Sequence, residues 1–209
     1  SILEIIAILS RSDYRSEIHK ELDIQINNLE KYQKRPEVDP ERLSIVLDDL
    51  RDSRNKIDAV GTQFLKPLKE CEFLSGIKHR STIPGGTCEF DLPEFNHWLR
   101  QPIERRQNDI EKWKNVLLPL CNAVSNMLWL IRASGETIEK TATNGMYQHR
   151  MIKNSSCKLL SITLLSKTSL YPEISGSQHR FTVRFLEWSE IDTRAIQTKE
   201  DVKFNLTIS

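Results

Sequence analysis

Hydrophobic residues recur at helical spacing from the N-terminus to about residue 132. Apolar positions there lie three or four residues apart, which places them on one face of an α-helix. The pattern predicts a first helix that ends at Ser10–Asp13 and a second helix that has Asp13 as its N-cap and stops at residues 34–36. A new helix is expected to start at Asp39, which precedes a proline. The second and third helices should form an antiparallel hairpin with charged residues on its outer face.

A shorter helix is expected from Phe64 to Leu74, and Pro67 limits how early it can begin. A loop that carries two adjacent glycines then interrupts the helical pattern. The pattern resumes beyond Pro102, where Pro119 should kink the helix or divide it in two.

After Gly135 apolar and polar residues alternate, and Thr, Val, Ile and Phe are frequent, as in half-buried strands. The segments expected to be strands are Lys158–Leu165, Arg180–Trp188 and Val202–Ile208. In the middle segment Phe181, Val183 and Phe185 alternate with Arg180, Thr182 and Arg184. This alternation predicts an antiparallel strand with an apolar inner face and a basic outer face.

The expected fold class is therefore α+β. A helical domain of antiparallel helices over residues 1–137 precedes a small antiparallel β-domain over residues 138–209. Residues 83–90 are a candidate for one further strand of the β-domain.

Composition describes an ordinary globular protein, with 38% hydrophobic and 28% charged residues among 209. The net charge of +1 gives the whole molecule no strong preference for nucleic acid or membrane. We expect a cytoplasmic protein, because no apolar run approaches the ~20 residues of a spanning helix and no secretory signal is present. The four cysteines are widely spaced, form no C-x-x-C pair and are expected to be reduced: Cys71, Cys88, Cys121 and Cys157.

The loop with the paired glycines Gly85 and Gly86 is the first candidate for chemistry. No phosphate-binding glycine pattern surrounds them, so we expect a tight turn. Phe90 and Trp98 are expected to anchor this loop, and residues 91–93 to start the next short helix.

No metal, cofactor or catalytic site is expected. None of the five histidines stands in a zinc-binding pattern. Cys88 and His97 are close enough in sequence to be a nucleophile and its base, but no third, orienting group is evident. A hydrolase built on this pair stays as an alternative that thiol labelling would test.

The charge distribution is more informative than the total. The segment from residue 140 to residue 184 contains seven basic residues and one acidic residue, Glu173, so its charge balance is 7 − 1 = +6. The basic residues are Lys140, Arg150, Lys153, Lys158, Lys167, Arg180 and Arg184, and His149 and His179 could add to them. Convergence on one face would suit an acidic partner. The alternatives are a merely solvated surface and a nucleic-acid-binding face, although the aromatic residues that stack on bases are few here.

Four motifs, in order, resemble the ZapD family of bacterial cell-division proteins associated with the Z-ring. Residues 81–99 resemble the signature S-I-P-G-G-x-C-x-F-D-L-P-x-x-x-x-W-L. Residues 144–148 read N-G-M-Y-Q, residues 170–176 read L-Y-P-E-I-S-G, and residues 180–185 read R-F-T-V-R-F. These motifs are spread over about a hundred residues, and the helical first part matches in length and pattern.

The resemblance implies a homodimer that binds the C-terminal tail of FtsZ, the tubulin-like division GTPase, and bundles FtsZ filaments at mid-cell. It implies no enzymatic activity, cofactor or membrane. In the family a basic surface involving the β-domain takes up the tail. The family's arginines fall on Arg180 and Arg184, and Arg11 matches a basic position of the helical part. His179 and Lys158 complete the expected site.

This chain departs from the family pattern at two points. Family members begin with a further strand and helix before the position of Ser1, so the sheet and the tail-binding pocket are expected to be incomplete here. Thr87 stands at the first of two positions that often carry cysteine, which argues further against a metal or redox role for Cys88.

Overall fold

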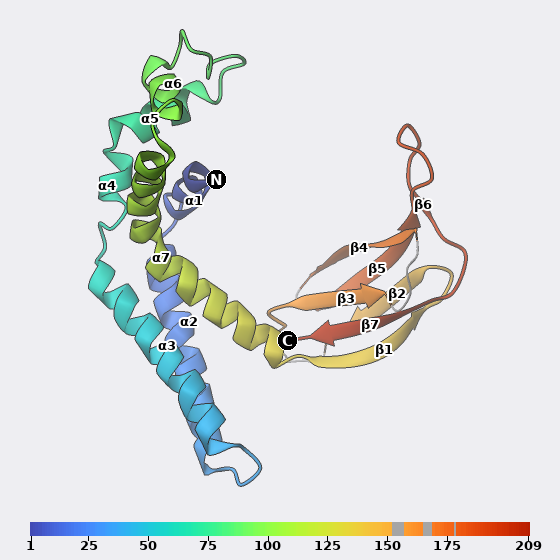
Figure 1. The fold of residues 1–209 in the computed structure, drawn as a ribbon. Coiled ribbons are helices and arrows are strands. Elements are labelled where there is room, and N and C mark those ends of the chain that lie inside the picture. Colours follow the sequence, from blue (N-terminus) through green and yellow to red (C-terminus); the bar gives the residue numbers. More distant parts are fainter. Residues whose placement is uncertain (152–156, 165–168, 178) are drawn as a thin grey trace. The chain divides into compact units, whose positions relative to one another are not determined.

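The chain is helical up to Ala133 and consists of strands from Glu136 onward (Figure 1). The computed structural model describes residues 1–151, 157–164, 169–177 and 179–209. Seven α-helices and one 3₁₀-helix precede a set of antiparallel strands, which confirms the α+β class. Two compact units divide within the last helix, at Met127 and Leu128. The expected domain boundary, between residues 137 and 138, lies at the start of the first strand.

The helices begin and end as follows: α1 Ile2–Leu9, α2 Tyr14–Glu30, η1 Lys31–Lys34, α3 Pro40–Val60, α4 Lys66–Lys69, α5 Glu72–Arg80, α6 Pro93–Leu99 and α7 Ile103–Ala133. The predicted starts of α2 and α3 are confirmed. The Asp13 carboxylate accepts the backbone N–H of Ser16 at 3.2 Å, and the Asp39 carboxylate accepts those of Glu41 and Arg42 at 3.0 and 3.2 Å. Each cap satisfies N–H groups that have no partner inside the helix.

Helices α2 and α3 form the predicted antiparallel hairpin (Figure 1). Arg15, near the start of α2, donates from Nε to the carbonyl of Ile57, near the end of α3, at 3.1 Å. At the opposite end of the hairpin, Arg51 pairs with Glu30 at 2.6 Å. The helices bury aliphatic residues at helical spacing: Ile18, Leu22 and Ile26 on α2, and Leu43, Leu47, Leu50 and Ile57 on α3.

The expected helix from Phe64 to Leu74 is instead two helices, α4 and α5, and the second continues to Arg80. Cys71 separates them in an extended conformation, with φ −71° and ψ 105°. The prediction of one helix was wrong because the apolar spacing does not reveal this break in the backbone.

Four aromatic rings hold the end of the helical unit together. Phe73, Phe95, Trp98 and Trp113 have neighbouring ring centroids 5.6–6.3 Å apart. Trp98 also donates from Nε1 to Asp109 at 3.0 Å. Trp98 therefore anchors the segment that follows the paired glycines, as expected.

Residues 83–90 form turns, so the expected extra strand is wrong. Their backbone bonds close locally: the Gly86 N–H donates to Ile83 O at 2.9 Å, and the Leu92 N–H donates to Cys88 O at 3.0 Å. Phe90 is 93% exposed and anchors nothing, whereas Leu92 is only 5% exposed and is the apolar anchor of the loop.

Helix α7 continues through Pro119, so the proline does not divide it, but the helix changes direction along its length (Figure 1). An 18-residue window of α7 has a mean hydropathy of 1.4, enough by length and composition alone for a membrane span. The expectation that no apolar run approaches that length was therefore wrong. The helix also contributes core residues, namely Leu117, Leu120, Ala123 and Met127.

The strands form two antiparallel sheets. Their bounds are β1 Glu136–Ala142, β2 Met146–Arg150, β3 Leu160–Leu164, β4 Leu170–Ser177, β5 Arg180–Glu187, β6 Ile196–Gln197 and β7 Val202–Ile208. The first sheet has the order β1-β7-β3, and the second has the order β2-β5-β4 with β6 also paired to β5. The three expected strands correspond to β3, β5 and β7. The others were not expected from the alternation of residues.

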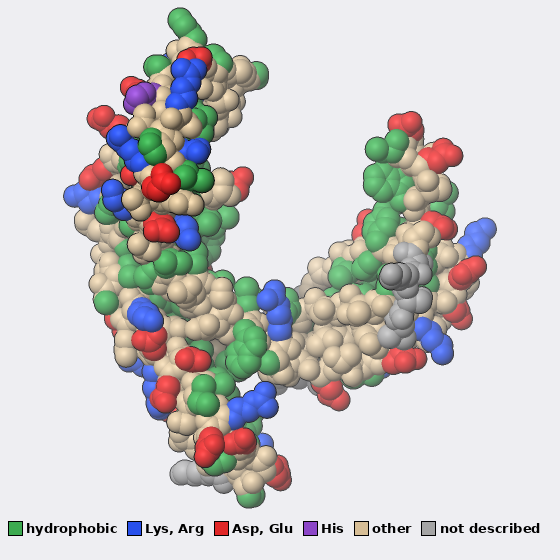
Figure 2. Space-filling model, in the orientation of Figure 1, with side chains coloured by type: hydrophobic (Ala, Val, Ile, Leu, Met, Phe, Trp, Pro, Cys, Tyr) green, Lys and Arg blue, Asp and Glu red, His purple; other side chains and the backbone are tan. Residues whose placement is uncertain are grey.

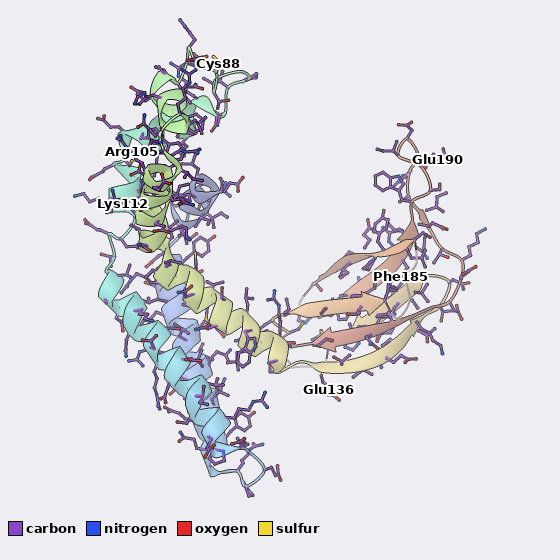
Figure 3. The ribbon with its side chains drawn as sticks, in the orientation of Figure 1. Cys88, Arg105, Lys112, Glu136, Phe185 and Glu190 are labelled. Atoms are coloured by element: carbon purple, nitrogen blue, oxygen red, sulfur yellow. The ribbon has the colours of Figure 1, made fainter. Side chains whose placement is uncertain are left out.

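One core joins the inner faces of both sheets. The second sheet contributes Phe181, Val183 and Phe185, and the first contributes Val202, Phe204 and Leu206. The rings of Phe185, labelled in Figure 3, and Phe204 lie 5.1 Å apart between centroids. All six side chains are buried, which confirms the predicted inner face of β5.

A two-residue turn carries the chain from the first sheet to the second. Asn144 and Gly145 have φ values of +50° and +69°, and the flanking residues Thr143 and Met146 form an antiparallel bridge. Positive φ at both positions favours an Asn-Gly pair. A Cβ at Gly145 would also meet the carbonyl oxygen of Thr198, so the glycine is needed for space as well as conformation.

Candidate binding surface on the second sheet

The outer face of the second sheet carries the predicted arginines. Arg180, Thr182 and Arg184 alternate with the buried residues of β5, and both arginines are exposed. The predicted orientation of β5 is thereby confirmed. In an antiparallel sheet, residues directly opposite each other point to the same face. The register therefore names the neighbours of each outer residue.

Three rows of side chains cross this face. The first row holds Arg150, Arg180 and Ser177, the second holds Gln148, Thr182 and Ser175, and the third holds Met146, Arg184 and Glu173. We call the six side chains of the first two rows the donor field. Each of the six carries an N–H or O–H donor, and none is a carboxylate.

The two arginines of β5 differ in their surroundings. Arg184 forms an ion pair with Glu173 directly across from it, and both side chains are about half exposed. Arg180 faces another arginine, Arg150, on β2. Neither Arg150 nor Arg180 has an ion pair or a side-chain hydrogen bond among the residues that the structure describes. The positive charge of this face is therefore uncompensated at the Arg150–Arg180 end.

A shallow hollow of about 380 Å³ lies over the donor field. Its lining residues are Gln148, Ser175, Gly176, Ser177, Arg180 and Thr182. The Ser177 oxygen accepts the backbone N–H of His179 at 3.4 Å, so its own hydroxyl hydrogen remains able to donate. The hollow is thus a polar, donor-rich surface that suits an anion.

The other predicted site residues lie outside the three rows of this face. His179 is exposed beside the start of β5, and its carbonyl accepts the Met151 N–H at 2.9 Å. Lys158 precedes β3 in the other sheet, and its N–H donates to Ser209 O at 2.7 Å. Arg11 is exposed between α1 and α2 in the helical unit.

The expected convergence of all the basic residues on one face was wrong. Lys140 lies opposite Phe204 in the first sheet. His149 lies on the inner side, where its ring stacks on Phe181 with centroids 4.9 Å apart and its Nδ1 is 3.1 Å from the hydroxyl of Tyr147. Burial also raises the pKa of that tyrosine. The alternation of side chains along β1 and β2 decides which faces Lys140 and His149 occupy. Neither strand was expected, so these orientations could not be predicted. Lys153 and Lys167 lie outside the described residues.

The candidate nucleophile and base each have a different hydrogen-bond partner. Cys88, at the loop end of the helical unit in Figure 3, lies with Sγ 3.1 Å from the Asp91 carboxylate. His97 Nε2 lies 2.9 Å from the side-chain amide of Gln101. Across the described part of the chain, no group of three or more His, Cys, Asp or Glu side chains is arranged to hold a metal ion.

Arg150 is the main functional candidate that sequence reasoning missed. It was counted in the charge balance but was not assigned to the site, because only the register of β2 against β5 places it beside Arg180. The N-G-M-Y-Q motif was the available signal. An Asn-Gly turn followed by alternating residues predicts a strand in which Met146, Gln148 and Arg150 share a face.

Known proteins match this chain along nearly its whole length. A family model described as "ZapD: Cell division protein" matches residues 1–184. The cell division protein ZapD of Methylococcus capsulatus is 36% identical over 205 residues, which cover 98% of this chain and 80% of that protein. The ZapD proteins of Chromobacterium violaceum and Ralstonia pickettii are 32% and 33% identical, and the matches cover 99% and 100% of this chain and 81% and 82% of theirs. The chain belongs to the ZapD family of cell division proteins.

Proposed function

We propose that this protein binds the C-terminal tail of FtsZ and, as a homodimer, cross-links FtsZ filaments into bundles. Membership of the ZapD family gives the chain a role in cell division. In the proposed function it acts by binding alone, without catalysis or a cofactor, in the cytoplasm at the mid-cell division site. The observation that carries the proposal is the exposed, uncompensated arginine charge on the outer face of the second sheet.

The bridging step follows from symmetry. A homodimer offers two equal tail sites, so one molecule can hold tails from two filaments at once. Each filament carries many tails, and binding one tail raises the effective concentration of its neighbours. Weak individual contacts therefore suffice for stable bundles.

Arg180 and Arg184 are the proposed tail contacts on β5. His179, Lys158 and Arg11 are further candidates. An ion pair between an exposed arginine and a carboxylate of the tail is screened by salt, so binding should weaken as ionic strength rises.

Co-sedimentation of the wild-type protein with FtsZ tests the proposal. We expect bundles with intact FtsZ and none with FtsZ that lacks its C-terminal tail. The double charge reversal Arg180→Glu and Arg184→Glu should abolish bundling, because it places two negative charges on the contact face. Light scattering coupled to size exclusion should show a dimer for both proteins.

Lys199→Glu with Lys203→Glu is the matched control. It makes the same change in net charge, and Lys203 lies on the outer face of the first sheet, opposite Thr141. Bundling by this control should equal that of the wild type. Bundling that survives the arginine reversal, with the fold and the dimer intact, would show that β5 is not the contact.

A further inference from the structure

We propose that the Arg150–Arg180 pair is a carboxylate-binding subsite for an acidic peptide, and that Arg184 lies at its border with its charge already balanced. This inference rests on the proposed function, because it names the ligand chemistry of the same face. It adds Arg150 to the site and assigns the two arginines of β5 different roles.

The arrangement of charge in the first row is unfavourable without a ligand. Directly opposed residues of antiparallel strands have Cβ atoms roughly 4.5–5.5 Å apart, and like charges at that spacing destabilise a sheet. Arg150 and Arg180 occupy such a pair, while Ser177, on the other side of Arg180, brings no negative charge. A bound carboxylate removes the repulsion by placing a negative charge between the two guanidinium groups.

The chemistry of the donor field matches a carboxylate. A guanidinium group donates two parallel N–H bonds to the two oxygens of a carboxylate, and two such groups satisfy most of its lone pairs. The hydroxyls of Ser177, Ser175 and Thr182 line the adjoining hollow and supply further donors. A carboxylate placed there meets donors on every side and no competing acid within the first two rows.

Arg184 has a different role. Its guanidinium is engaged by Glu173 across the strand pair, so a second carboxylate would have to displace an existing partner. The pair also marks where the donor field ends. We therefore expect neutralisation of Arg184 to affect tail binding much less than neutralisation of Arg180.

An apolar patch gives the ligand a direction. Tyr171, which is 39% exposed, lies directly opposite the half-buried Leu186 of β5. Met146, which is 42% exposed, lies opposite Arg184, two positions before Leu186 on the same strand. Leu186 lies six positions beyond Arg180 on β5, about 20 Å for a strand that rises ~3.3 Å per residue. The surface thus fits an extended peptide with a carboxylate at one end and an apolar side chain at the other.

The same observations favour a peptide over nucleic acid. The subsite offers two uncompensated charges, and Glu173 borders it, whereas a phosphate backbone needs a longer basic track. No aromatic side chain stands in the donor field for bases to stack on.

Fluorescence anisotropy with a labelled FtsZ tail peptide tests the subsite. We expect Arg150→Gln and Arg180→Gln each to weaken binding about tenfold or more, since each removes charged hydrogen bonds. Arg184→Gln should weaken binding less than about threefold, and Lys203→Gln should leave it unchanged. Tyr171→Ser should weaken binding without changing its salt dependence, whereas the Arg150 and Arg180 variants should flatten that dependence. Circular dichroism confirms that each variant is folded.

Two modified peptides identify the source of the carboxylate. One has an amidated C-terminus, and the other has its Asp and Glu residues replaced by Asn and Gln. The peptide that lacks the bound carboxylate should have the same affinity for the wild type and for Arg150→Gln, because its interaction with Arg150 is already absent. If both modified peptides bind as well as the parent, the subsite holds no carboxylate and the proposal is overturned.

The outcomes separate this inference from the proposed function. If the tail peptide binds while Arg150→Gln and Arg180→Gln bind it like the wild type, the subsite is wrong and the function stands. If the tail peptide does not bind, the proposed function is wrong. The subsite is then tested with an unrelated acidic peptide: shifts of the Arg150 and Arg180 amide resonances support it, and unchanged resonances overturn it. A short DNA duplex that binds more tightly than both peptides at equal salt would overturn the assignment to a peptide.

Discussion

The helical hairpin α2–α3 and the outer face of the second sheet use charge in opposite ways. On the hairpin, basic and acidic side chains meet across the two helices, and Figure 2 shows Lys and Arg interspersed with Asp and Glu over the helical unit. On the outer face of the sheet, Arg150 faces Arg180, and among the described residues of its three rows only Arg184 has an acidic partner.

His19 lies between acidic residues of both helices of the hairpin. Its Nδ1 lies 3.3 Å from Asp23 on the same helix, and its Nε2 lies 3.1 Å from Asp58 on α3. Asp23 in turn accepts Arg54 at 3.1 Å. The contacts of His19 with Asp58 and of Arg54 with Asp23 cross between α2 and α3, so the network ties the two helices together.

The difference suggests a criterion for reading charged surfaces. Opposite charges that meet across two elements stabilise the fold, each by a modest amount because the side chains are partly exposed. Like charges that stand opposite each other cost stability, so their presence calls for a ligand. By this criterion the charged pairs of the hairpin are structural, and the donor field is the proposed binding site.

The largest expected effect comes from removing the support beneath the donor field. Phe204→Ala deletes a fully buried ring that packs against Phe185 and leaves a cavity between the sheets. We expect the free energy of unfolding of the second compact unit, Leu128–Ser209 (the β-unit), to fall by about 3–5 kcal/mol. Urea denaturation followed by far-ultraviolet circular dichroism measures it, and tail binding should be lost together with the fold.

Phe90→Ala is the control, because it makes the same chemical change at a side chain that is 93% exposed. The free energy of unfolding should change by less than about 0.5 kcal/mol. A loss as large as that of Phe204→Ala would show that Phe90 is buried in solution.

The sequence pattern predicted β3, β5 and β7, in which buried or half-buried residues alternate with more exposed ones. Strand β5 alternates throughout, and β7 buries every second residue at its start, so both were expected. Strand β1 begins with six positions that are exposed or half buried, and β4 contains Pro172 and a glycine. Proline is tolerated in β4 because it lies at the edge of the sheet. Such strands take their conformation from their neighbours, which local spacing does not encode.

The candidate binding surface was predictable only in part, because alternation within a strand fixes the face of a side chain but not its neighbours on other strands. The orientation of Arg180 and Arg184 follows from alternation within one strand. The partners of those residues depend on register, which tertiary packing fixes, so neither Arg150 beside Arg180 nor Glu173 beside Arg184 follows from the sequence. Charge counting alone therefore overestimated the positive charge of the face.

Paired substitutions test the criterion by the sign of their effect on stability. Asp58→Ala removes the partner of His19 and Arg15 and should destabilise the hairpin by roughly 0.5–1 kcal/mol. Arg150→Gln removes a like-charge contact and should stabilise the β-unit by a few tenths of a kcal/mol while weakening tail binding. Thermal unfolding at low salt measures both. Destabilisation by Arg150→Gln would show that this arginine supports the fold and would remove the contrast.

Glu173→Gln sharpens the contrast within the sheet itself. It releases Arg184 from its ion pair and adds one uncompensated positive charge to the outer face. We expect the labelled tail peptide to bind about two- to fivefold more tightly at low salt, with little difference at high salt. Glu200→Gln makes the same charge change at an exposed position outside this face and should leave the affinity unchanged. Weaker binding by Glu173→Gln would mean that the Arg184–Glu173 pair itself shapes the site.

The smallest effect concerns the cap that starts the hairpin. The hydroxyl and the backbone N–H of Ser16 donate to the Asp13 carboxylate and lower its pKa below the ordinary value of 3.8. A lowered folded-state pKa means that the charged carboxylate stabilises the folded chain above the unfolded-state pKa. This stabilisation disappears as the pH falls through the lower, folded-state value. Asp13→Ala should therefore lower Tm on the order of 2 °C at neutral pH, and the difference should shrink only below about pH 4. Asp192→Ala, at an exposed loop acid, should show no difference at either pH. A Tm difference for Asp13→Ala that persists unchanged in strong acid would mean that the carboxylate charge does not hold the helix start, and that the hairpin depends on its cross-helix pairs and buried aliphatic residues instead.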